Sequence, residues 1–144
     1  MGTWGHTAFQ NDGACDWAWE VPKSGLPLIG SAFDEVLGCN ELIEAPQCEN
    51  AIAAAETLCV LGKRPGVHIL DDVAKWAATE RKSPTLELID KAKRSLHKIL
   101  ADSELKELWA ESDEFAAWKM NVEDILSRLP EGVTAPKRPF WKFW

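Results

Sequence analysis

The segment EAPQCENAIAAAETLCVLG, residues 44–62, constrains the fold more than any other part of the chain. Pro46 suits the first turn of a helix and Gly62 suits the end of one, so a helix is predicted between them. Four of the five residues from 51 to 55 are alanine, and such small side chains let neighbouring helices approach closely. Apolar residues and cysteines recur at helical spacing: Cys48, Ile52, Ala55 and Cys59. The sequence therefore predicts a helix at the centre of the fold.

The rest of the chain has the same helical spacing of apolar residues, and no stretch alternates with a period of two. Prolines and glycines in residues 21–30 are expected to separate the first two helices. The predicted helix starts are residues that can cap or open a helix: Asn11 or Asp12, Ser31, Asp71 or Asp72, Ser83, Asp102 or Ser103, and Ser112. With 144 residues, the prediction is one all-α bundle of about six or seven helices, residues 1–130, followed by a basic aromatic tail, residues 131–144.

The N-terminal segment MGTWGHTAFQNDGACDW is distinctive because it holds large aromatic residues where chain ends usually fray. Trp4 and Phe9 are predicted to anchor this segment in the helical body, each burying about 150–250 Å². Asn11 and Asp12 are expected to end the segment and start the first helix through their side chains. Asp16 follows one turn later, where it is expected to accept a backbone N–H or a tryptophan N–H. An extended aromatic segment packed on the bundle is therefore predicted.

Glu56 lies on the predicted central helix, between Ile52 and Cys59, and so borders its apolar face. A carboxylate in that place needs hydrogen-bond donors. The candidates in the N-terminal segment are the indole of Trp4, the amides of residues 2–5 and the ring of His6. The sequence thus predicts that Glu56 holds the N-terminal segment in place.

Three separated stretches point to a known family: MGTWGHTAFQNDGACDW, EAPQCENAIAAAE and LADSELKELWAESDEFAAWKMNVEDILSRL. In this order they resemble the bacterial proteins grouped as domain of unknown function 4259, over residues 1 to about 129. The departures from the shared pattern are residues 13–15, the proline-rich stretch 21–30 and the aromatic tail. The resemblance implies a bacterial helical protein and carries no established activity.

Charge is divided unevenly along the chain. Residues 1–62 hold nine acidic residues and one lysine, a net of −8, whereas residues 63–144 hold fifteen basic and fourteen acidic residues, a net of +1. An acidic half disfavours nucleic acid as a partner, because phosphate binding needs a basic surface. It suits a basic protein partner or serves solubility alone. The carboxylates predicted to form a partner surface are Glu35, Glu41, Glu44 and Glu49.

Motifs for catalysis, cofactors and metals are absent from the sequence. It contains no phosphate-binding loop, no G-x-S-x-G, no G-x-G-x-x-G and no E-x-x-H. The oxygens of Asn11, Asp12 and Asp16 suit a hard cation, but helix capping explains the same residues. His68 with Asp71 and Asp72 has the spacing of a helix start rather than of a metal site. The four cysteines, Cys15, Cys39, Cys48 and Cys59, show no metal-binding spacing and are predicted to be buried, reduced thiols.

Two functions therefore stand open. The first is a non-catalytic protein-binding module, of the immunity or antidote type, that uses the acidic N-terminal half. The second is a metal- or ligand-binding protein, or an enzyme, whose site lies between the N-terminal segment and the central helix and is lined by Trp4, His6, Asn11, Asp12, Asp16 and Glu56.

The tail and the overall hydropathy add two further expectations. The tail either folds back or mediates a homodimer through Phe140, Trp141, Phe143 and Trp144. No apolar run is long enough to span a membrane and no secretion signal opens the chain, so a cytoplasmic location is expected.

Overall fold

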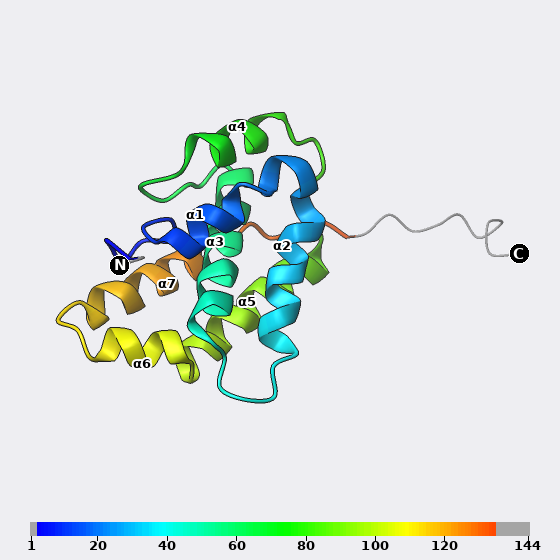
Figure 1. Ribbon diagram of the computed structural model, residues 1–144. Helices are drawn as coiled ribbons and strands as arrows, with labels where there is room; N and C mark the ends of the chain where they lie inside the picture. Colours follow the sequence, from blue (N-terminus) through cyan, green and yellow to red (C-terminus); the bar gives the residue numbers. More distant parts are fainter. Residues whose placement is uncertain (1–2, 135–144) are drawn as a thin grey trace, which may run out of the picture.

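Helix α3 (Ala45–Leu61) runs through the middle of a bundle of seven helices in the computed structural model, which describes residues 3–134 (Figure 1). The structure confirms the all-α prediction. Within the described residues the only β pairing is two isolated bridges, Thr3–Asn11 and Thr85–Val133. The other helices are α1 (Asp12–Ala18), α2 (Val21–Leu37), α4 (Asp71–Thr79), α5 (Leu86–Ala101), α6 (Glu104–Ala110) and α7 (Phe115–Arg128).

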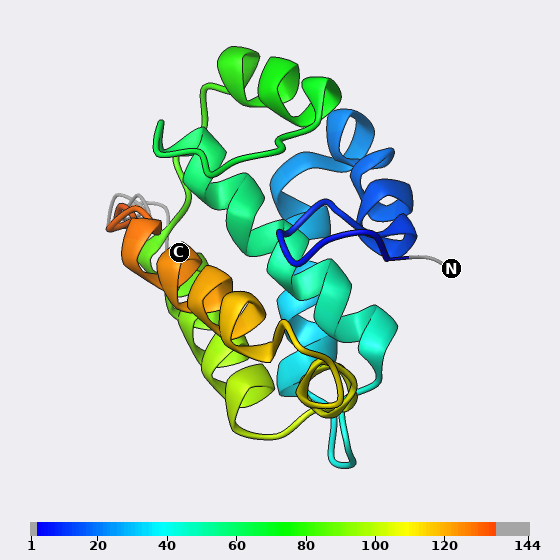
Figure 2. The same ribbon diagram turned by 90° about the vertical axis from the view of Figure 1, so that its left-hand side faces the viewer.

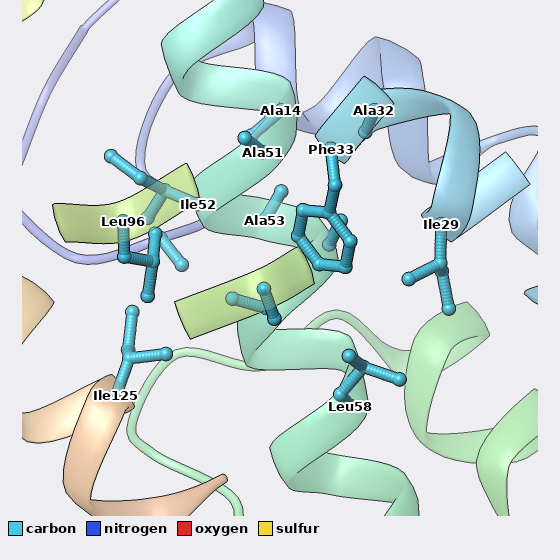
Figure 3. Close-up of a cluster of buried hydrophobic side chains, with 14 of the residues drawn as sticks. Ala14, Ile29, Ala32, Phe33, Ala51, Ile52, Ala53, Leu58, Leu96 and Ile125 are labelled. Carbon is cyan, nitrogen blue, oxygen red and sulfur yellow. The ribbon is translucent and has the colours of Figure 1, made fainter. Parts of the chain in front are cut away.

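Helix α3 contacts all six other helices, and every residue from Ala51 to Cys59 is buried. Figure 2 shows this helix crossing the centre of the molecule with α1 and α7 on different sides of it. The small side chains predicted from the sequence allow this close packing. Figure 3 shows the large side chains that gather around it from neighbouring helices, among them Ile29, Phe33, Leu96 and Ile125.

Helix α2 consists of two helical parts joined at a kink, so residues 21–30 do interrupt the helix, but over a shorter stretch than predicted. Its backbone leaves helical geometry at Gly25 alone (φ 57°, ψ −138°), and the helix resumes at once with Pro27 near its new start. Glycine adopts this left-handed conformation readily, and proline is tolerated in a first helical turn. Ser31 is therefore not a cap but lies within α2, where its hydroxyl donates to the carbonyl of Pro27 (3.0 Å).

The helix caps agree with the sequence at two ends and differ at three. Asn11 caps α1 through Ala14 N–H (2.7 Å) and Ser103 caps α6 through Lys106 N–H (3.1 Å). Helix α4 has both predicted aspartates in its first turn rather than at the cap position. Helix α5 is capped by Thr85 instead of Ser83, and Ser112 precedes α7 by three residues, with Glu114 at its N-cap position.

The later start of α5 has a cause elsewhere in the chain. Val133 N–H donates to Pro84 O (3.0 Å), and Leu86 N–H donates to Val133 O (2.9 Å). This pairing holds the chain extended before Leu86. Gly132 (φ 83°) lets the segment that contains Val133 pass close to the backbone of Thr85 and Leu86.

The chain beyond Thr134 includes Phe140, Trp141, Phe143 and Trp144, so the predicted dimer contact lies outside the described residues. Among residues 3–134, no helix is long and apolar enough to cross a membrane.

The close packing of α3 predicts that its alanines cannot be enlarged. Ala53→Leu should lower the free energy of unfolding by about 1–3 kcal/mol, because a packed core has no room for the added carbons. Ala78→Leu, on the exposed side of α4, is the matched control and should change it by less than about 0.5 kcal/mol. Urea unfolding of both variants measures the difference, and equal losses would contradict the central position of α3.

Candidate functional site

Residues 3–11 form a loop (the N-terminal loop) that closes on itself. Trp4 N–H donates to Gln10 O (3.0 Å), and Gln10 Oε1 accepts hydrogen bonds from the hydroxyl (2.7 Å) and N–H (3.2 Å) of Thr7. Phe9 is buried as predicted, but Trp4 is 59 % exposed, so its predicted role as an anchor is wrong. The loop's open end, where Thr3 pairs with Asn11, leaves Trp4 at the surface, whereas Thr7 to Phe9 enter the body.

The N-terminal loop, α3, α6 and α7 enclose a hollow of about 20 Å³ whose polar lining includes His6, Asn11 and Glu49. A space of this size holds about one water molecule. Of the six residues predicted to line a ligand site, only His6 and Asn11 border this hollow. Asp12 and Asp16 are exposed on α1. The structure therefore brings together only part of the predicted set and leaves little room beside it.

Glu49 is the carboxylate closest to this hollow. Burial raises the pKa of Glu49 above its ordinary value, and the neighbouring charge of Asp12 raises it further. Both effects disfavour the ionised carboxylate. Glu49 was predicted to belong to an exposed acidic surface. The structure places it on α3, half-buried beside the first turn of α1.

Glu56 is 2 % exposed and has the donors that its position requires. Arg128 binds both carboxylate oxygens, from Nη1 to Oε2 (2.7 Å) and from Nη2 to Oε1 (2.9 Å), and Gly66 N–H adds a third hydrogen bond (3.2 Å). The prediction that Glu56 needs donors is confirmed, but the predicted donors in the N-terminal segment are wrong.

Arg128 makes two further hydrogen bonds. Its guanidinium donates to the carbonyl of Arg64 (2.8 Å) and to the carboxylate of Asp124 (2.7 Å). The hydrogen bonds with Glu56 hold the pKa of Arg128 above its ordinary value. A Cβ at Gly66 would collide with Glu56 Oε1, so this residue must be small. The network joins α3, α7 and the connection 62–70 and pairs the buried charge of Glu56, which makes it a structural centre.

The cysteines are free thiols in the structure. Burial raises the pKa of Cys48 to about 11 and that of Cys59 to about 12, and burial is also the main cause that raises the pKa of Cys15. Cys48 and Cys59 are buried as predicted, whereas Cys15 and Cys39 are only partly buried. The raised pKa values keep the thiols of Cys15, Cys48 and Cys59 protonated at neutral pH and make them poor nucleophiles.

Residues 3–134 contain no group of three or more histidine, cysteine or acidic side chains able to hold a metal ion. His68 is exposed and adopts a positive φ of 58° just before α4.

The connection between α2 and α3, residues 38–44 (the acidic loop), presents charged residues on a fixed backbone. Glu41 and Glu44 are exposed on it, and Glu35 is exposed at the end of α2. None of these three carboxylates forms an ion pair within the described residues. The neighbouring Asp34 is bound to Lys91 (2.9 Å) and so adds less free charge.

Hydrogen bonds from α5 and α6 hold the acidic loop at both ends. Lys98 Nζ donates to the carbonyls of Val36 and Cys39 (2.8 Å each). Glu104 N–H donates to Ile43 O (2.9 Å), and its carboxylate accepts Ala45 N–H (2.7 Å).

The two apolar residues of the acidic loop point to different environments. Ile43 is buried at 1 % exposure, whereas Leu42 is 43 % exposed between Glu41 and Glu44. Sequence reasoning missed Leu42, because nothing in the pair Leu-Ile indicates which side chain enters the core.

The family model described as domain of unknown function (DUF4259) matches residues 2–121. No curated protein and no solved structure matches the chain.

The Glu56–Arg128 pair predicts a large loss of stability when only one of its two charges is removed. Arg128→Met leaves a buried carboxylate with one donor and should lower the free energy of unfolding by about 3–5 kcal/mol. The double variant Glu56→Leu/Arg128→Met should recover most of this loss, since it removes both charges. Asp124→Ala removes only the exposed partner and should cost less than about 1 kcal/mol. Urea unfolding of the four proteins decides, and equal losses for Arg128→Met and Asp124→Ala would contradict the assignment.

The raised pKa of Glu49 predicts that replacing its carboxylate by a neutral amide raises stability by an amount that depends on pH. The folded protein binds this proton more tightly than the unfolded chain, so the stability that Glu49 contributes grows as pH falls toward its ordinary value of 4.5. Glu49→Gln should therefore raise Tm at pH 7, and the gain should shrink toward zero below about pH 4.5. Glu123→Gln, on the exposed side of α7, is the control. A Tm gain that does not depend on pH would count against this account.

Proposed function

We propose that this chain, which belongs to the DUF4259 family, is a non-catalytic protein-binding module that uses its acidic loop and Glu35 to bind a basic protein. The observation that carries the proposal is Leu42, exposed between two carboxylates that have no partner within the described residues. An exposed apolar residue bordered by charged ones fits the arrangement of a protein interface, which has an apolar centre and a polar rim.

The fixed backbone of the acidic loop supports this proposal. Binding costs free energy when it orders a flexible loop, and a loop that is already held avoids much of that cost. Lys98 and Glu104 provide this restraint from α5 and α6. The exposed charges of Glu35, Glu41 and Glu44 would steer a basic partner toward Leu42 and align it there.

An antidote that covers the basic surface of a toxic enzyme is the specific form of this function that fits the surface. The alternative from the sequence, a ligand or metal site between the N-terminal loop and α3, has only the hollow of about 20 Å³ available there. The geometry therefore favours the protein-binding function.

The proposal predicts salt-sensitive binding that depends on the acidic loop. The purified protein, immobilised and exposed to lysate of its source organism, should capture one basic protein at low salt and less of it at 0.15 M salt, where the screening length is about 8 Å. Glu35→Lys/Glu41→Lys/Glu44→Lys should abolish capture, and Leu42→Ser should weaken it. Quantitative mass spectrometry of the eluates measures both.

The matched control changes the net charge equally at another place. Glu107→Lys/Glu111→Lys/Glu123→Lys reverses three exposed glutamates of the C-terminal half and should leave capture unchanged. If both triple variants lose the partner alike, the binding follows net charge and the proposed surface is wrong.

A further inference from the structure

Helix α1 and the two residues that follow it share an exposed surface, the outer face of α1, that combines acidic residues with one large aromatic side chain. Asp12 and Asp16 lie on α1, Trp19 is its C-cap and Glu20 precedes α2, and all four are exposed. Trp19 is 68 % exposed, as is Met120, and these two are the most exposed large apolar residues in the described part of the chain. The indole of Trp19 offers a large, rigid apolar surface that another molecule can cover.

The outer face of α1 continues into a groove at the start of α4. This hollow of about 230 Å³ has walls from Ala18, Trp19 and Leu70 and carboxylates from Asp71 and Asp72. Together with the outer face of α1 it forms the surface that we call the α1–α4 groove. Its five carboxylates form no ion pair within the described residues: Asp12, Asp16, Glu20, Asp71 and Asp72.

One segment of this chain has the complementary chemistry. Residues 135–144, APKRPFWKFW, carry three basic side chains and four aromatic ones, and they lie outside the described structure. Aromatic side chains fill an apolar groove, and lysine or arginine pairs with carboxylates and stacks on an exposed indole. The basic, aromatic segment is therefore complementary to the acidic, partly apolar groove.

The segment's reach decides which copy supplies it. Figure 2 shows that the described chain ends on the opposite side of the body from α1. Ten residues extend to at most about 35 Å. A body of this size has a radius of gyration of about 14 Å, so half its circumference is about 57 Å, too far for a segment that stays on its own body.

We propose that the α1–α4 groove binds residues 135–144 of a second copy of this chain, and that two copies exchange these segments. Trp19 and Leu70 receive the aromatic side chains, while the five carboxylates pair with Lys137, Arg138 and Lys142. The surface is separate from the acidic loop, so this inference does not rest on the proposed function.

The experiment is sedimentation velocity of the full chain over a range of concentrations, with two variants that each disable one side of the contact. The groove variant is Asp16→Lys/Trp19→Ser/Glu20→Lys, and the tail variant replaces Phe140, Trp141, Phe143 and Trp144 by serine. The wild-type chain should dimerise, and each variant alone should dissociate at least about tenfold more readily. Mixing the two variants should restore a dimer, because the groove of one copy and the segment of the other remain intact.

A matched control and a charge exchange keep the result interpretable. Glu111→Lys/Met120→Ser/Glu123→Lys alters an equally exposed apolar residue and two glutamates elsewhere, and it should dimerise as the wild type does. Should the groove variant fail to fold, Asp16→Lys/Glu20→Lys combined with Lys137→Glu/Arg138→Glu should dimerise better than either half alone.

Three results would overturn the proposal. A wild-type chain that stays monomeric at every concentration would mean that the segment packs on its own body or binds a different protein. A dimer that persists in the folded groove variant would place the contact elsewhere. A mixture of the two variants that remains monomeric would show that the groove and the segment do not meet.

Discussion

The complete burial of residues 51–59 of α3 is the constraint on which the rest of the structure depends. Helix α3 contacts six other helices, and this stretch of it has no side left for water, so its residues must be small, apolar or fully hydrogen-bonded. Alanines at positions 51 and 53–55 meet the first condition and let neighbouring helix axes approach to about 8–10 Å. Glu56 cannot meet it, and its bidentate pairing with Arg128 follows from its place on this helix.

This organisation leaves the surface as the place where the protein meets other molecules. The interior is filled by α3 and its neighbours, and the N-terminal loop closes a hollow of about 20 Å³ against the N-terminal half of α3. Most carboxylates of the acidic N-terminal half are consequently exposed. They gather beside exposed apolar residues in two places, around Leu42 on the acidic loop and around Trp19 on α1. Both proposals concern these surfaces, and the buried ion pair concerns stability alone.

Much of the fold could be predicted because its causes are local. Capping side chains, glycines, prolines and the spacing of apolar residues act within a few positions of one another, so α3 and the caps at Asn11 and Ser103 were readable from the sequence. The candidate site was less predictable. Burial of Phe9 followed from its size, but the same reasoning applied to Trp4 failed, because a hairpin-like loop turns only its tip toward the body.

The sequence by itself determined that this chain forms an all-α bundle, that α3 lies at its centre and that Glu56 requires donors. Only the tertiary structure decided which donors these are, since Arg128 lies 72 residues away along the chain. It also decided where α5 begins, because Val133 holds the preceding residues extended. Local sequence encodes helices through hydrogen bonds four residues apart, whereas contacts between distant segments depend on how the helices pack, and packing is a property of the whole chain.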